Sequence, residues 1–186
     1  MTTTSFDLAQ LLIAWRTRLT EWATDGSLST AAREALQLGY KPAELTTLID
    51  QWSKADFSAL PPVEVLDGSV LPGAAGAYAI STGTIYLNRD WLALASTDQA
   101  IAVLTEELGH HLDGLLNEED TPGDEGSIFA TLIMGKGFTA DSISDLSKEI
   151  DTGTIQLGER ILAVEFSSGF THPLPGSEVT VAMNEY

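Results

Sequence analysis

The segment Thr105-Glu106-Glu107-Leu108-Gly109-His110-His111-Leu112-Asp113 decides how the fold of this chain is interpreted. It brings two of the three histidines of the chain together with three carboxylates, inside a stretch that otherwise has the apolar periodicity of a buried helix. Ser96-Thr97-Asp98-Gln99 has the pattern of a helix start. We therefore predict one helix from about Thr97 to Leu116, with the histidines and carboxylates near its middle.

When its residues are placed 100° apart, this helix has polar and ionisable side chains on one side and apolar side chains on the other. Glu106, His110 and Asp113 lie on one side, close enough to converge on one point. His111 lies nearer the apolar stripe, and we interpret it as a half-buried histidine with a hydrogen-bond partner. Gly109 allows a neighbouring backbone to approach closely. The opposite side is predicted to face the core and consists of Ile101, Leu104, Leu108, Leu112 and Leu115.

A metal ion needs such a convergence of imidazole and carboxylate groups. Glu106 and His110 are four residues apart, so they lie one helical turn from each other and can reach one cation. Zinc peptidases use His-Glu-x-x-His on such a helix, where the glutamate takes a proton from the metal-bound water. Glu107 has the place of that glutamate, and Glu106 stands where the first histidine belongs. A carboxylate can bind zinc, but it weakens the Lewis acid and favours harder ions.

A further ligand is expected either from Asp113 or from Asp124-Glu125-Gly126, which precedes a predicted helix over 127–134. We interpret Asp124 as the cap of that helix. Glu125 is equally compatible with a first-turn acid and with a metal ligand. A cluster of this composition is also common on a solvated helix face, where it forms only i,i+4 pairs. Convergence in three dimensions is what distinguishes these interpretations.

The rest of the chain predicts helices first and strands afterwards. The first 60 residues have helical spacing, with a second helix beginning near Ser29 and a third after Pro42. Strands and a hairpin are predicted over 63–70, 77–87, 154–157 and 161–166, and a further helix over 141–150. The segment Ile85-Tyr86-Leu87-Asn88 is the clearest strand. In zinc peptidases of this type an edge strand lies along the cleft and pairs with the substrate backbone, and we expect the strand Thr84–Asn88 to have this position. The resulting prediction is an α+β fold with a helical subdomain at 1–60 and an α+β domain at 61–186.

Composition excludes several classes of partner and site. The net charge of −18 leaves no basic patch for nucleic acid or an anionic membrane. The absence of cysteine excludes disulfides and thiolate zinc sites. The sequence contains no run of 18 apolar residues, so it predicts no membrane span. The first residues lack the basic start of a cleavable signal peptide.

Three stretches show a resemblance to a known family: TIYLNRDWL at 84–92, EELGHHLD at 106–113 and DTPGDEG at 120–126. With the residues around them they resemble the zincin-like domain near the N-terminus of large cyanobacterial calcium-binding, haemolysin-type (RTX-like) proteins. RLTEWATDGSLS at 18–29 is similar as well. The resemblance covers roughly a third of the chain. It implies a zincin-like fold, with an N-terminal helical bundle, a small twisted sheet and an active-site helix, in a parent protein that is secreted or displayed at the cell surface.

Matching this resemblance residue by residue gives His110 the place of the second metal histidine and Glu107 that of the catalytic glutamate. No third histidine follows, because Leu116 stands where the metzincin pattern needs one. The expected function is a metal-dependent peptidase that uses Zn²⁺ or another divalent ion. Its ligands would be Glu106 and His110 with Glu125 or Asp113, and its substrate a peptide or protein, including its own parent chain.

Two alternatives remain open from the residues. The loss of the first histidine favours a pseudo-peptidase, a non-catalytic module for binding, export or surface display. The acidic residues could also hold a structural calcium ion, although their spacing does not match an EF-hand loop.

Overall fold

The structure is a computed structural model that describes residues 7–118, 121–135 and 152–167. Within these ranges the chain forms helices and one sheet, which confirms the α+β class. The helices are α1 (Leu8–Asp25), α2 (Ser27–Ala35), α3 (Ala43–Ser53), α4 (Arg89–Leu92), α5 (Thr97–Leu116) and α6 (Glu125–Ile133). The strands are β1 (Val63–Leu66), β2 (Gly76–Ala79), β3 (Thr84–Asn88), β4 (Thr152–Leu157) and β5 (Arg160–Ser167). The helix predicted over 141–150 lies outside the described residues.

The helix starts follow from side chains that bind the free backbone N–H groups of the first turn. Asp7 accepts hydrogen bonds from two backbone N–H groups at the start of α1. Ser96 and Gln99 form a reciprocal capping box at α5, whose bounds agree with the prediction. The predicted start of the second helix near Ser29 is wrong by two residues. Gly26, with a φ of 89°, ends α1 in the left-handed region, and α2 begins directly after it.

The five strands form one sheet in the order β1-β3-β2-β5-β4, in which only the β1–β3 pair is parallel. The predicted position of Thr84–Asn88 at an edge is wrong, because β1 pairs with one side of β3 and β2 with the other. All five residues of β3 are buried. A strand that is buried on both faces belongs in the interior of a sheet. Among the described strands, β1 and β4 form the edges.

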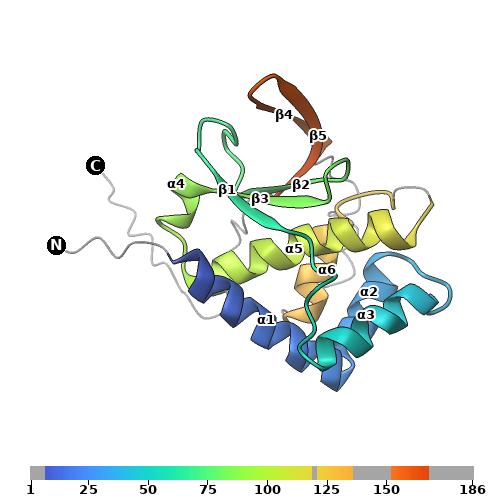
Figure 1. Ribbon diagram of the computed structural model, residues 1–186. Helices are drawn as coiled ribbons and strands as arrows, with labels where there is room; N and C mark the ends of the chain where they lie inside the picture. The colour runs from blue at the N-terminus through green and yellow to red at the C-terminus, as the bar shows by residue number, and fades with distance from the viewer. Residues whose placement is uncertain (1–6, 119–120, 136–151, 168–186) are drawn as a thin grey trace, which may run out of the picture.

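Helix α5 lies between the sheet and helices α1, α2, α3 and α6 (Figure 1). Its residues are therefore buried on several sides, including the acidic side that the sequence pattern placed opposite the core. The predicted core stripe holds from Ile101 to Leu112, but Leu115 is 49% exposed, so its assignment to the core is wrong. Leu115 is exposed because it is the second-last residue of α5, close to where the helix leaves the packed layers.

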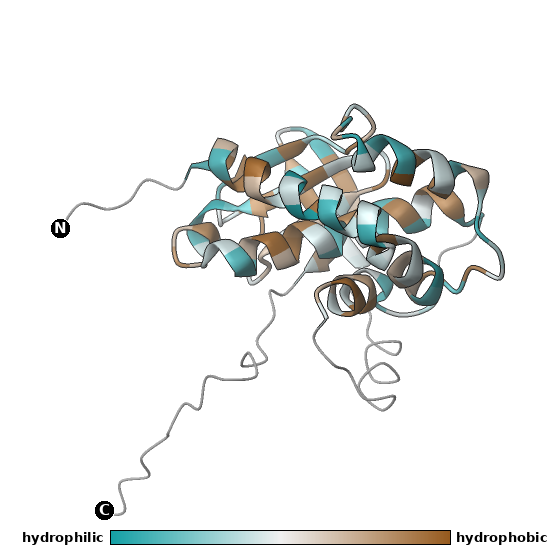
Figure 2. Ribbon diagram, turned by 90° about the horizontal axis from the view of Figure 1, so that it is seen from below, coloured by the Kyte–Doolittle hydropathy of each residue, from teal (hydrophilic) through white to brown (hydrophobic). Residues whose placement is uncertain are grey.

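Side chains from α1, α2 and α3 share one hydrophobic core with α5, α6 and the inner face of the sheet. Hydrogen bonds between distant segments reinforce this packing. Trp15 Nε1 donates to Thr105 Oγ1 at 3.2 Å, and Asn117 Nδ2 donates to the Leu36 carbonyl at 3.1 Å. Seen from below, the helices carry both hydrophilic and hydrophobic residues, as amphipathic helices on a core do (Figure 2). In the described part of the chain no helix combines the length and apolarity that a membrane crossing requires.

Candidate metal centre

Ionisable side chains from three elements meet next to α5, and all of them are buried except Glu165, which is half-buried. Helix α5 contributes Glu106, Glu107 and His110, which are all at most 4% exposed. The start of α6 contributes Glu125 together with its capping residue, and strand β5 contributes Glu165. Each isolated buried charge is unfavourable, so such a cluster needs protons or a cation to compensate its carboxylates.

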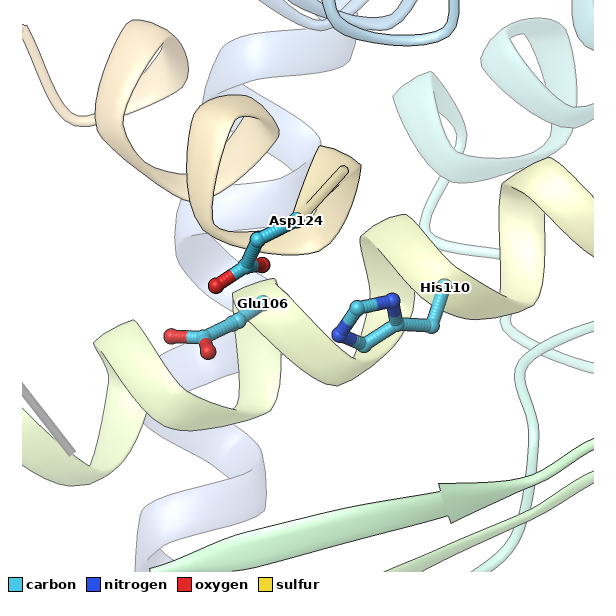
Figure 3. Close-up of side chains that lie close together, drawn as sticks. All are labelled: Glu106, His110 and Asp124. Atoms are coloured by element: carbon cyan, nitrogen blue, oxygen red, sulfur yellow. The ribbon is translucent and has the colours of Figure 1, made fainter. Parts of the chain in front are cut away.

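Glu106, His110 and Asp124 form a first group, in which one potential ligand atom from each residue lies within 4.8 Å of the others. Figure 3 shows the outer nitrogen of the His110 ring turned toward both carboxylates. Asp124 also caps α6, because its Oδ1 accepts a hydrogen bond from the Ser127 backbone N–H at 2.8 Å. The predicted cap is thus confirmed, and the same residue joins the candidate ligand group.

His110, Glu125 and Glu165 form a second group around the other nitrogen of the ring. His110 Nδ1 lies 2.8 Å from Glu125 Oε1 and 3.0 Å from Glu165 Oε2. Sequence reasoning missed Glu165, which lies in the hairpin 55 residues after His110. No local signal identified it, since a single acid in a strand is usually interpreted as a solvent-facing residue.

The close approach of α5 and α6 brings these groups together. A Cβ atom on Gly109 would lie 2.7 Å from the Gly126 Cα, which confirms the role predicted for Gly109. A Cβ on Gly126 would in turn lie 2.5 Å from His110 Nε2. Both helices therefore need glycine at this crossing, and the absent side chains leave the imidazole room against the start of α6.

Glu107 is fully buried, and neither of its carboxylate oxygens has a hydrogen-bond partner among the described residues. The carboxylate lies against β2 at Gly76, where a Cβ would come within 2.8 Å of Oε1. Burial raises the pKa of Glu107 well above its usual value; His110 opposes this rise, while Glu106 and Glu165 add to it. A buried carboxylate without a hydrogen-bond partner lowers the stability of the folded protein, so a contribution to stability does not explain a glutamate at this position.

His110 and Glu125 each change the pKa of the other. Burial lowers the pKa of His110, but the hydrogen bonds to Glu125 and Glu165 outweigh it, and the resulting pKa is well above the usual value. Burial raises the pKa of Glu125 to about 7, against the opposing effect of its hydrogen bond to His110. The metal-free cluster therefore holds protons at neutral pH that the same groups would have lost in water.

Asp113 belongs to neither group. Its carboxylate accepts hydrogen bonds from Asn117 Nδ2 and from the backbone N–H and hydroxyl of Thr121, so it anchors the loop after α5. His111 is half-buried, its Nδ1 lies 2.9 Å from the Tyr78 hydroxyl, and burial lowers its pKa. This confirms the interpretation of His111 as a half-buried histidine with a hydrogen-bond partner.

The structure thus brings together Glu106, Glu107, His110 and Glu125 of the predicted site, adds Asp124 and Glu165, and places Asp113 apart. In comparisons with known proteins, no family model, no curated protein and no solved structure matches this chain. The resemblance to zincin-like domains accordingly stays a prediction from the three quoted motifs.

Proposed function

We propose that Glu106, His110 and Asp124 bind a divalent cation and that, with Glu107 beside them, they form the active site of a zincin-like metal-dependent peptidase. One observation carries the proposal: the fully buried carboxylate of Glu107, which has no hydrogen-bond partner within residues 7–118, 121–135 and 152–167, adjoins a group of three potential ligands. Perturbed, desolvated groups of this kind gather at catalytic sites, because catalysis needs charges that folding alone would avoid.

The residues present fit a metal ion. The donor set of two carboxylates and one imidazole is compatible with Zn²⁺, and its oxygen content suits Mn²⁺ or Fe²⁺ at least as well. When bound, the ion would lower the pKa of a water molecule and polarise a peptide carbonyl. The negative charge of the cluster would then be balanced by a cation instead of by protons.

Glu107 is proposed as the general base. A glutamate with a raised pKa takes and returns protons closer to neutral pH than an ordinary glutamate does, which suits proton transfer from water to a leaving amine. The desolvated site near Gly76 favours this role, because the carboxylate is not held by competing hydrogen bonds among the described residues.

The substrate class we propose is a peptide or protein segment, with the parent chain of a secreted or surface-displayed protein as one source. The substrate backbone would not pair with β3, whose two sides already bind β1 and β2. The residue of the cluster with the most exposed side chain is Glu165, at 19%, so we expect substrates to approach from the β5 side.

The test combines metal analysis with a peptide library. We expect the purified protein to hold close to one equivalent of metal and to cleave peptides. Glu107→Gln should keep the metal and lose cleavage, while His110→Ala and Asp124→Ala should lose both. Glu64→Gln on the exposed part of β1 is the matched control and should behave as wild type. Cleavage by Glu107→Gln at the wild-type rate would disprove the mechanism.

A pseudo-peptidase that holds a metal structurally is the second candidate. It is favoured by the burial of the three proposed ligands, each at most 6% exposed, which a substrate could reach only after a local opening of the structure. The two functions differ in one result. A wild-type protein that binds metal stoichiometrically but cleaves no member of the library is a pseudo-peptidase.

A further inference from the structure

The two candidate groups share a single imidazole, and this raises the question of which nitrogen binds the metal. We propose that the cation binds Nε2 of His110, together with Glu106 and Asp124, and that Glu125 and Glu165 are positioning residues that both accept the Nδ1–H. The inference rests on the proposed function and deepens it. Of the six ionisable residues in the cluster, three would bind the metal, Glu107 would act as the base, and Glu125 and Glu165 would orient the imidazole ring.

The distances at Nδ1 favour this assignment. The contacts of 2.8 Å to Glu125 and 3.0 Å to Glu165 are those of hydrogen bonds. A zinc ion on the same nitrogen would need a bond of about 2.0–2.1 Å, with both carboxylates rearranged around it. Metal-binding histidines commonly donate their other ring N–H to a carboxylate, which fixes the tautomer and strengthens the ligand.

The surroundings of Nε2 complete the assignment. This nitrogen faces Gly126, where the absence of a side chain preserves the space next to it. The ring edge points toward the carboxylates of Glu106 and Asp124 (Figure 3). Glu106 and Asp124 therefore lie on the Nε2 side of the ring, opposite the Nδ1 hydrogen bonds.

Glu165 gives the sheet a direct part in the metal site. In the antiparallel pairing of β2 with β5 it lies opposite Tyr78, a buried residue of the main core. Cross-strand partners project from the same face of a sheet, so Glu165 reaches toward α5 from a rigid element. We infer that the β4–β5 hairpin contributes to metal affinity although it supplies no ligand.

The experiment is a long-range ¹H–¹⁵N NMR spectrum of the full chain, labelled with ¹⁵N-histidine and loaded with zinc. We expect His110 to carry its proton on Nδ1 and to show the metal-induced shift on Nε2. A proton on Nε2 with the shift on Nδ1 would overturn the inference while leaving metal-dependent cleavage intact. If zinc shifts neither nitrogen, both this inference and the zinc-dependent form of the proposed function fail.

Variants provide a second readout in zinc affinity, measured by competition with a chelator. Glu165→Ala and Glu125→Ala should each weaken binding by about tenfold, as loss of an orienting carboxylate does. Glu165→Gln should keep most of the wild-type zinc affinity, because the amide oxygen can still accept the Nδ1–H. Glu159→Ala, in the turn of the same hairpin, is the matched control and should bind as wild type. Wild-type affinity in both alanine variants would contradict the positioning role.

Discussion

Among the individual residues, Glu107 is the position where folding and function conflict most directly. Its carboxylate is fully buried, it has no hydrogen-bond partner in the described part of the chain, and burial raises its pKa. Removing one buried, unsatisfied group typically changes stability by about 1–3 kcal/mol. A residue that only served the fold would be expected to be apolar here.

Glu107→Gln is therefore expected to make the metal-free protein more stable at pH 7 and to leave its stability nearly unchanged near pH 4. The folded-state pKa of Glu107 is above its unfolded value, so the native state keeps a proton that the unfolded state releases as the pH rises above about 4.5. This costs the wild type up to ~1.4 kcal/mol per pH unit, a cost that glutamine does not have.

Urea unfolding of both proteins in EDTA, at intervals from pH 4 to pH 7, measures this difference. A difference between the two proteins that stays constant over that range would mean that Glu107 does not titrate as the structure indicates.

Asp113 illustrates a residue with ligand chemistry and a structural task. Asp113→Ala is expected to destabilise the protein by about 1–3 kcal/mol, because the buried Thr121 N–H loses its acceptor. Metal affinity should change little, whereas Asp124→Ala should lose the metal. Unfolding curves and a zinc titration distinguish the two roles. Loss of zinc from Asp113→Ala with full stability would identify Asp113 as a ligand.

At the element scale, the crossing of α5 and α6 determines the geometry of the site. The backbone contact at Gly109 and Gly126 brings the capping residue of α6 and its first-turn acid alongside His110. Any side chain at the crossing would separate the two helices, and the ligand group would open with them.

Gly109→Ala is expected to destabilise the protein by about 1–3 kcal/mol and to weaken metal binding, since its Cβ would meet backbone that cannot yield. Gly114→Ala, on the same helix, is the matched control. Its Cβ would meet only the flexible end of the exposed Ile80, so the gain in helix propensity, up to about 1 kcal/mol, should dominate. Thermal unfolding of both variants checks the pair, and equal effects would contradict the close crossing.

At the scale of the whole molecule, the sheet and two helices meet at a cluster that is more anionic than a metal-free core readily holds. A cation that binds only the folded state stabilises it by about 2.7 kcal/mol at a free concentration one hundred times its dissociation constant. We expect zinc or manganese to raise the unfolding temperature of the wild type and EDTA to lower it. His110→Ala should show no metal-dependent shift; a shift of wild-type size in that variant would place the bound ion elsewhere.

Features that depend on neighbouring residues could be predicted from the sequence. Capping side chains and apolar periodicity located α5 from Thr97 to Leu116, Asp124 capped the next helix as predicted, and Gly109 marked a close helix contact. The spacing of Glu106 and His110 also brought them into one group, because a single helical turn fixes their separation.

Features that depend on distant segments could not be predicted in this way, because they arise when these segments pack together. The parallel pairing with β1 placed β3 in the sheet interior, and the strand pairing of β5 with β2 brought Glu165 to His110. The contact of α6 with α5 made the cap Asp124 part of a ligand group. These outcomes follow from which surfaces pack together across the chain, whereas local sequence patterns specify only the surfaces that each element can offer.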